Sequence, residues 1–173
     1  RQTIFLFGGS QGSAYLNQMM SQVAETISGA GIQVLWQTGD LEYVKYKSLE
    51  SDSIRIVPFV NNMADAYAIS DLLVCRSGAL TLAEITVCGK PAILIPFPHA
   101  AGNHQQKNAE ALVKSGAAKI LFEKSLTPKV LMHAIMNLIH NKEKLNNMGL
   151  ASKELGRPNA TTEIVDHILG KAQ

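Results

Sequence analysis

Residues 76–84 contain the residue types best suited to binding a ligand in this chain. They follow an apolar run, residues 71–75, that is typical of a buried strand, and they open an apolar helical pattern. A small-residue turn between a strand and a helix leaves backbone N–H groups unpaired, and with the helix dipole these attract an anion such as phosphate. Glu84, one turn inside the expected helix, can accept hydrogen bonds from two neighbouring sugar hydroxyls. One element thus offers a phosphate site and a ribose site, which indicates a nucleotide.

A purely structural interpretation of this segment is also open. Ser77 can cap the helix, or Thr81 and Glu84 can form a capping box. A capping box would start the helix at Thr81, whereas the periodicity through Leu80 and Leu82 favours an earlier start. The functional interpretation is favoured.

A glycine-rich loop, residues 8–13, follows the first expected strand. Gly9 and Gly12, like Gly78 in the segment above, let the backbone approach a ligand, and the Ser10 hydroxyl can bond a phosphate oxygen. The loop is not a P-loop, because no Gly-Lys-Ser/Thr follows. It also lacks the three-glycine spacing of dinucleotide-binding proteins, so a tight strand-to-helix turn is the alternative.

Two further loops have a composition suited to a nucleotide sugar. In residues 57–63, an apolar wall with free backbone groups suits the face and edge of a base; the alternative is an Asn-capped helix with Phe59 and Met63 in the core. In residues 96–109, Gln105 and Gln106 each offer a donor and an acceptor for sugar hydroxyls. The alternative for part of this loop is a helix cap by Asn103.

No metal or cofactor is expected. His99 and His104 lie in the last of these loops, but no third ligand stands at a suitable spacing. Cys75 and Cys88 share no metal-ligand spacing, and we interpret both as small core residues in a reducing compartment.

Short apolar strands alternate with helical patterns along the chain. Strands are expected at residues 4–7, 32–36, 53–57, 72–75, 92–95 and 118–122. Helices are expected at residues 14–28, 41–49, 63–69, 79–87, 105–115, 128–140, 142–155 and 160–169. Strands without a polar face favour a mostly parallel sheet covered on both sides, hence a doubly wound α/β fold. Such sheets bind ligands at the carboxyl ends of their strands.

Composition narrows the class of protein. The chain has 173 residues and a net charge of +2, which fits a single domain without the basic footprint of nucleic-acid-binding proteins. No apolar stretch approaches the ~20 residues that cross a bilayer. The chain begins at Arg1 and enters a core strand at once, so it is expected to be a fragment of a longer protein.

Together these loops resemble the C-terminal half of the proteins of the MurG family. These are the N-acetylglucosaminyltransferases that form lipid II in peptidoglycan synthesis. The matching residues are 8–12, 61–63 with 66–67, 76–81 with Glu84, and 104–106 with 108–109; residues 115–118 and 159–160 also fit. The resemblance runs from end to end. Each motif alone is loose, but their order and spacing are specific. The family often has an acidic residue where this chain has Asn61 and Asn62.

The resemblance implies one half of a two-domain GT-B glycosyltransferase that binds UDP-N-acetylglucosamine. The implied contacts run from base to sugar: Val60 backbone with Phe59 and Met63 for uracil, Glu84 for ribose, Ser10 with Ala79, Leu80 and Thr81 for the diphosphate, and Gln105 and Gln106 for the GlcNAc hydroxyls. We therefore expect Ser10, Thr81, Glu84 and Gln106 to line one pocket.

The resemblance also implies inverting transfer of GlcNAc to a lipid-linked acceptor, in the cytoplasm at the inner face of the cell membrane. The family's acceptor site, membrane-facing patch and catalytic base belong to an N-terminal domain outside these residues, so the fragment alone is expected to be inactive. Three alternatives stay open: the donor-binding subunit of a two-chain transferase, like the eukaryotic dolichol-linked enzyme; a non-catalytic UDP-sugar sensor; and, more distantly, a sugar-nucleotide epimerase.

Overall fold

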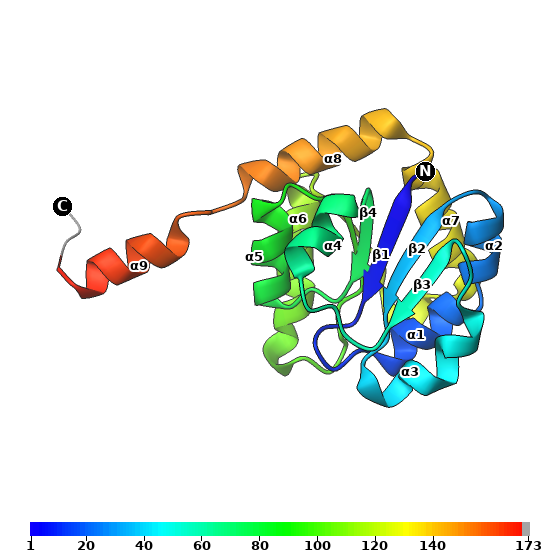
Figure 1. Cartoon of the computed structure of the whole chain (residues 1–173). Helices are drawn as coiled ribbons and strands as arrows, with labels where there is room; N and C mark the ends of the chain where they lie inside the picture. Colours follow the sequence, from blue (N-terminus) through cyan, green and yellow to red (C-terminus); the bar gives the residue numbers. More distant parts are fainter. Residues whose placement is uncertain (171–173) are drawn as a thin grey trace.

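A single parallel sheet forms the centre of the molecule. The computed structural model describes residues 1–170, and Figure 1 shows their arrangement. The strands are β1 (Thr3–Phe7), β2 (Gln33–Gln37), β3 (Ile54–Val57), β4 (Leu72–Cys75), β5 (Ala92–Leu94) and β6 (Ala118–Ile120). They pair in parallel in the order β3-β2-β1-β4-β5-β6. This confirms the doubly wound α/β class.

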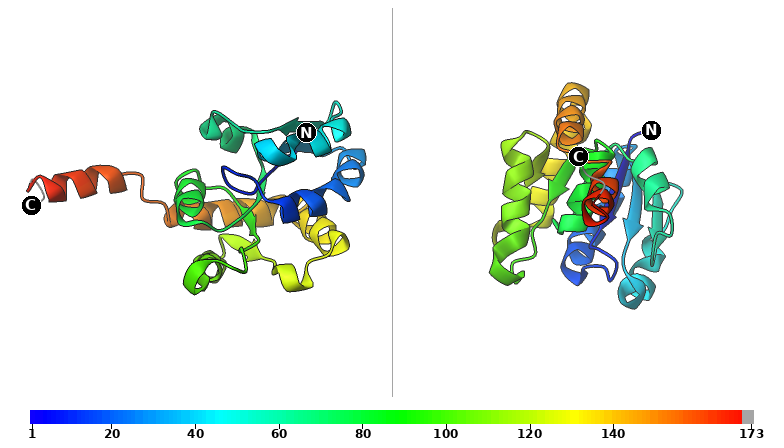
Figure 2. Two further views of the ribbon diagram at one scale, coloured as in Figure 1. Left: turned by 90° about the horizontal axis from the view of Figure 1, so that it is seen from below. Right: turned by 90° about the vertical axis from the view of Figure 1, so that its left-hand side faces the viewer.

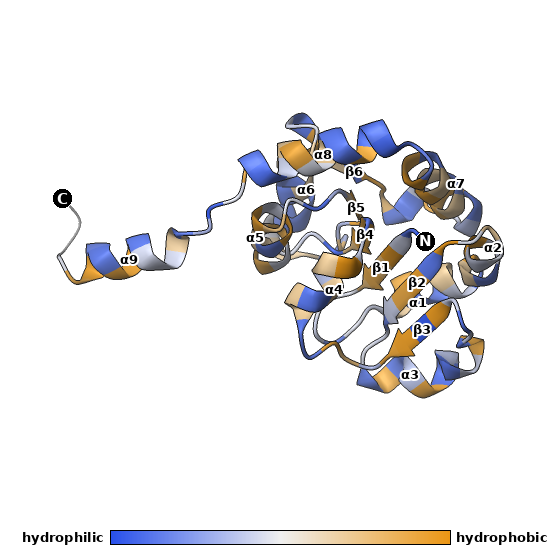
Figure 3. Ribbon diagram, turned by 45° about the horizontal axis from the view of Figure 1, so that its top comes forward, coloured by the Kyte–Doolittle hydropathy of each residue, from blue (hydrophilic) through white to orange (hydrophobic). Residues whose placement is uncertain are grey.

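Helices cover both faces of the sheet, because alternate strand residues point to opposite sides. In β1, Ile4 and Leu6 join one apolar cluster, while Phe5 and Phe7 join the other. The first cluster includes residues of α1 (Ala14–Ser21), α2 (Ala24–Gly29), α3 (Asp40–Tyr46), α7 (Pro128–Ile139) and α8 (Lys142–Glu154). The second includes residues of α4 (Met63–Ile69), α5 (Ala79–Val87) and α6 (His104–Lys114). Figure 3 shows the hydrophobic residues concentrated on the strands.

The last two helices differ in how they pack. Helix α8 crosses the amino edge of the sheet and packs on α5 and α7. Helix α9 (Ala160–Ile168) extends away from the rest of the chain and buries none of its residues (Figures 1 and 2). Within residues 1–170, no helix combines the length and the apolar character that crossing a bilayer requires.

The expected elements agree closely with the observed ones except at two helices. The helix expected at residues 41–49 ends at Tyr46, and a 3-10 helix follows over Lys47–Leu49. The pattern predicts a single helix over residues 14–28, but α1 ends at Ser21 and α2 begins at Ala24. Val23 leaves the helical conformation (φ −125°, ψ −14°). Its side chain still packs in the same core as Met20 and Ile27. The apolar spacing therefore continues across the break, and the sequence pattern does not reveal it.

The two cysteines differ, so the expectation that both lie in the core is wrong for Cys88. Cys75 ends β4 and is buried, and this burial raises the pKa of its thiol. Cys88 is exposed because it sits at the C-cap of α5, beyond the last turn of the helix.

Thiol labelling checks this difference. In the native protein one thiol, that of Cys88, should react rapidly with Ellman's reagent, whereas Cys75 should react only after denaturant is added. A Cys88→Ser variant should then show no fast-reacting thiol. Two fast thiols in the wild-type chain would contradict the burial of β4.

A close backbone contact fixes α8 over the sheet edge. A Cβ atom at Gly149 would lie 2.9 Å from the carbonyl oxygen of Gly89, which is tighter than packed atoms allow. Gly149→Ala should therefore lower the free energy of unfolding by about 1–3 kcal/mol in urea titrations. Gly29→Ala is the matched control: nothing lies within 4 Å of its Cβ position at the end of α2. That control should stabilise by about 0.4–1 kcal/mol. Equal effects would contradict the contact.

Candidate functional site

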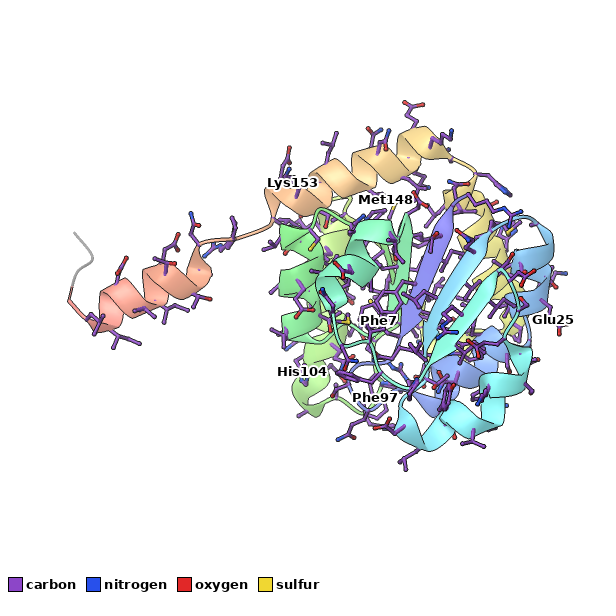
Figure 4. All side chains as sticks on the ribbon, in the orientation of Figure 1. Phe7, Glu25, Phe97, His104, Met148 and Lys153 are labelled. Carbon is purple, nitrogen blue, oxygen red and sulfur yellow. The ribbon has the colours of Figure 1, made fainter. Side chains whose placement is uncertain are left out.

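A cavity of about 600 Å³ opens at the carboxyl edge of the sheet. It lies where β1 and β4 are neighbours and the strand order reverses, the position at which doubly wound sheets bind ligands. In Figure 4, Phe97 marks this edge, while Met148 and Lys153 of α8 lie at the opposite one. The cavity is lined by residues 8–15 of the β1–α1 loop with Arg76, Gly78, Thr81, Phe97, Gln105 and Glu123.

A larger cavity, of about 1120 Å³, lies at the amino edge beside α8 and includes Arg1, Lys90 and Lys142 in its lining. The glycine loop and the N-terminus of α5 are not part of it. We therefore place the functional site at the carboxyl edge, where ligands of this fold class bind.

The glycine loop lines one side of the cavity, and its backbone adopts a conformation that residues other than glycine rarely adopt. Gly9 and Gly12 have φ values of 94° and 78°. A Cβ atom at Gly12 would lie 2.0 Å from the carbonyl oxygen of Thr38, so this glycine is also required by close packing. The loop ends at Ser13, whose Oγ accepts the Leu16 N–H at the start of α1. Ser10 remains exposed within the loop and lines the cavity.

The N-terminus of α5 is open toward this loop. Its N-cap residue is Gly78, and no side chain of the described residues caps it. The Ser77 hydroxyl instead donates to the carbonyl of Gln105. Because the helix begins at Ala79, a capping box starting at Thr81 is also ruled out. The N–H groups of the first turn, from Ala79 to Thr81, are thus left for an anion.

Arg76 lies beside the cavity and was not predicted as a site residue. Its Nη2 donates to Ser13 Oγ (2.9 Å), and its Nη1 donates to the carbonyls of Ile95 and Pro96. The guanidinium also forms an ion pair with Glu123. The signal in the sequence was an arginine directly after a strand of four buried residues, where a charged side chain needs partners.

Glu84 is held by a buried tyrosine. The Tyr67 hydroxyl of α4 donates to Glu84 Oε2 (2.8 Å). Burial, and then this hydrogen bond, raise the pKa of Tyr67, so the hydroxyl stays protonated and remains a donor. Tyr67 thus orients the carboxylate and leaves its second oxygen for a ligand. Glu84 does not line the cavity at the carboxyl edge. Its side chain extends from α5 to Tyr67 of α4.

The loop between β3 and α4 combines a helix cap with a bonded backbone. Asn62 caps α4 by accepting the N–H groups of Ala64 and Asp65, so the structural alternative is correct for this residue. The Val60 N–H is bonded to Gln37 Oε1 (2.8 Å), and Gln37 Nε2 donates to Gly9 O (2.9 Å). A nucleobase could therefore bond to the Val60 carbonyl, because the Val60 N–H is already bonded to Gln37.

Two apolar residues of the same loop differ in exposure. Phe59 is 47% exposed and is not a core residue, contrary to the alternative interpretation. Met63 packs partly against the core, as does Val60. Gln37, which joins this loop to the glycine loop, was missed, because a glutamine at the end of a strand gives no distinctive pattern.

The two glutamines at the start of α6 face different directions. Gln105 lines the main cavity, and its Oε1 accepts the Phe97 N–H (3.0 Å). Gln106 instead donates to Glu110 (2.7 Å) and lines a neighbouring cavity of about 200 Å³. Consecutive residues of a helix are separated by about 100°, and here the two side chains line different cavities.

The expectation of one pocket is therefore wrong for two of its four residues. Ser10 and Thr81 share the main cavity, whereas Gln106 and Glu84 lie outside its lining. Phe97 and Glu123 line both the main cavity and that of Gln106, so these two are adjacent. His99 and His104 are exposed, and residues 1–170 contain no cluster of three or more metal-ligating side chains.

Comparison with known proteins identifies the family. Residues 3–164 match the model of the glycosyltransferase family 28 C-terminal domain. A relative from Bacillus cytotoxicus, named UDP-N-acetylglucosamine–N-acetylmuramyl-(pentapeptide) pyrophosphoryl-undecaprenol N-acetylglucosamine transferase, is 40% identical over 171 residues. The alignment covers 96% of this chain and 47% of the relative. The chain thus spans about half the length of the curated relatives it matches.

Solved structures agree with this result. The crystal structure of Acinetobacter baumannii MurG superposes with a TM-score of 0.86 at 32% identity, covering 98% of this chain and 52% of that one. The glycosyltransferase VinC, solved in complex with dTDP, superposes with a TM-score of 0.75 at 17% identity, over 99% of this chain and 42% of its own. The second likeness concerns the fold alone.

Proposed function

This chain belongs to the family of the glycosyltransferase family 28 C-terminal domain, and we propose that its residues 1–173 are one UDP-sugar-binding domain that holds UDP-N-acetylglucosamine. The complete protein would transfer GlcNAc with inversion to a lipid-linked acceptor, from lipid I to lipid II. The relatives named as N-acetylglucosamine transferases of an undecaprenol-linked substrate support this proposal.

One observation carries the proposal: the uncapped N-terminus of α5 faces a glycine loop across the cavity at the switch in strand order. The free N–H groups of the first α5 turn and the dipole of that helix suit a diphosphate, and the glycine loop opposite lets it approach the backbone closely. Ser10 and Thr81 add hydroxyls from opposite sides. These groups can stabilise the charge on a UDP leaving group without a metal ion.

The remaining proposed contacts lie on either side of this diphosphate site. Toward α4, the Glu84 carboxylate oriented by Tyr67 would accept the ribose hydroxyls, and the Val60 carbonyl with Phe59 and Met63 would contact uracil. Toward α6, Gln105 would contact the GlcNAc hydroxyls. Gln106 requires rotation away from Glu110 to join it. An extended ligand that crosses the edge, rather than one compact pocket, fits this layout.

The reaction needs groups beyond this site. An acceptor hydroxyl attacks the anomeric carbon, a base removes its proton, and the bond to the UDP oxygen breaks. The carboxyl-edge cavity supplies groups for the leaving diphosphate. We assign the base, the acceptor site and the contact with the inner face of the cytoplasmic membrane to the half of the protein that the relatives have beyond this chain. The 173-residue chain alone should therefore bind donor but not transfer sugar.

Calorimetric titration of the chain with UDP-GlcNAc, UDP-glucose and UDP tests the proposal. UDP should bind, because the base, ribose and diphosphate contacts lie in this chain. UDP-GlcNAc should bind more tightly than UDP if Gln105 contacts the sugar hydroxyls, and UDP-glucose, which shares the hydroxyls outside the 2-position, should show a similar gain. Equal affinities for UDP and both sugar nucleotides would remove Gln105 from sugar binding. No binding of any of the three would refute the proposed function.

The ribose contact is tested through Glu84. Glu84→Ala should weaken the binding of UDP by about 1–3 kcal/mol, since the ribose hydroxyls lose their acceptor. Tyr67→Phe keeps the Glu84 carboxylate but removes the hydrogen bond that orients it, so it should weaken UDP binding less than Glu84→Ala does. The wild-type chain should prefer UDP over 2′-deoxy-UDP, and Tyr67→Phe should reduce that preference. Exposed Glu143→Ala at the start of α8 is the control and should bind UDP normally. An unchanged affinity in Glu84→Ala would limit Glu84 to a structural role.

A further inference from the structure

We propose that Arg76 is a positioning residue that holds the phosphate-binding loops together, and that Glu123 neutralises its charge so that the guanidinium does not itself bind phosphate. This inference rests on the proposed function, because it concerns how the same site is built. Neither residue was among the ligand contacts expected from the sequence.

Arg76 connects the loops that follow four strands. It stands directly after β4, and its Nη2 reaches Ser13 in the loop after β1 (2.9 Å). Its Nη1 donates to Ile95 and Pro96 carbonyls, after β5, at 3.2 and 3.3 Å. Its ion-pair partner Glu123 follows β6. One planar guanidinium thus fixes the relative position of the segments around the cavity.

The contact with Ser13 links Arg76 to the loop that would bind phosphate. Ser13 Oγ accepts hydrogen bonds from the guanidinium and from the Leu16 N–H at the start of α1. Ser13 also packs against Gly8, where a Cβ atom would lie 2.4 Å from it. Moving Ser13 would therefore displace the glycine loop relative to the N-terminus of α5. Pre-organised donors bind an anion without further ordering cost.

The charge of Arg76 is already compensated before any ligand binds. The Arg76 and Glu123 side chains are only 10% and 16% exposed, so each needs the other's charge. The guanidinium also lies over the Phe97 ring, with Cζ 5.4 Å from its centroid. The backbone of Glu123 is fixed in turn, because the Tyr15 hydroxyl donates to its carbonyl (3.0 Å).

These contacts require an arginine in particular. A lysine carries the same charge, but its compact ammonium cannot reach partners on several segments in one plane. If Arg76 acted as a charge on the phosphates, lysine would largely replace it. If it positions the loops, lysine should fail almost as completely as the uncharged glutamine.

The experiment follows UDP and uridine binding by NMR titration for the wild-type chain, Arg76→Lys, Arg76→Gln and Glu123→Gln, at low and high salt. Both Arg76 variants should weaken UDP by about tenfold or more and by a similar factor, the effect of losing ~1.4 kcal/mol. Uridine, which lacks phosphate, should bind each folded variant as it binds wild type. Arg55→Lys, which alters the exposed pair of Arg55 with Glu50, is the matched control and should change neither ligand.

Glu123→Gln tests the neutralising role separately. Its amide oxygen keeps an acceptor for Arg76, while the negative charge is removed from the cavity. UDP should bind this variant more tightly than wild type at low salt, and the gain should disappear at high salt because the added attraction is screened. Weaker UDP binding by this variant would overturn the neutralising role.

Three other results would decide against positioning. Wild-type UDP affinity in Arg76→Lys would show that charge alone suffices. Equal losses for UDP and uridine in both Arg76 variants would show a general structural role. Wild-type affinity in Arg76→Gln would exclude any role. A wild-type chain that does not bind UDP would instead refute the proposed function, so the two failures are distinguishable.

Discussion

The constraint on which this structure depends is the reversal of strand order between β1 and β4. Both strands run in the same direction, but their connections leave toward opposite sides of the sheet. The loops after them therefore separate at the carboxyl edge instead of covering each other. The N-terminus of α5, whose N-cap residue Gly78 has no side chain to cap it, therefore faces the glycine loop across a cavity. Every proposed ligand contact lies in a loop or helix that follows one of the parallel strands of the sheet, which places it toward this edge.

An edge with so many loops also needs internal support, and buried polar side chains provide it. Asn17 donates to the Thr38 carbonyl and accepts the Trp36 indole N–H, which ties α1 to the end of β2. Gln37 joins the glycine loop to Val60, and Arg76 joins Ser13 to the segments after β5. Each of these side chains is buried, and each has two or more hydrogen-bond partners. Satisfied polar networks of this kind fix one geometry, whereas an unpaired member would be costly.

The sequence predicts the elements of the fold well because their signal is local. Four-residue apolar strands and helical spacing are visible without tertiary information, and the bounds of α4, β4 and α5 were predicted as observed. The break at Val23 was missed because its side chain keeps the apolar spacing. The site was less predictable. The open end of α5 followed from the small residues before it, but the roles of Arg76, Gln37 and Tyr67 depend on partners that lie 17 or more positions away.

The motifs of this chain mix two kinds of residue that a sequence cannot separate. Within the glycine loop, Ser13 is engaged by α1 and Arg76, whereas Ser10 faces the cavity. At the start of α6, Gln105 lies in the cavity and Gln106 outside it. The difference is set by helical direction and by bonds to distant segments, not by residue type. A binding motif in this fold is therefore better understood as a scaffold with a few free groups: the structural members orient the loop, and the free ones meet the ligand.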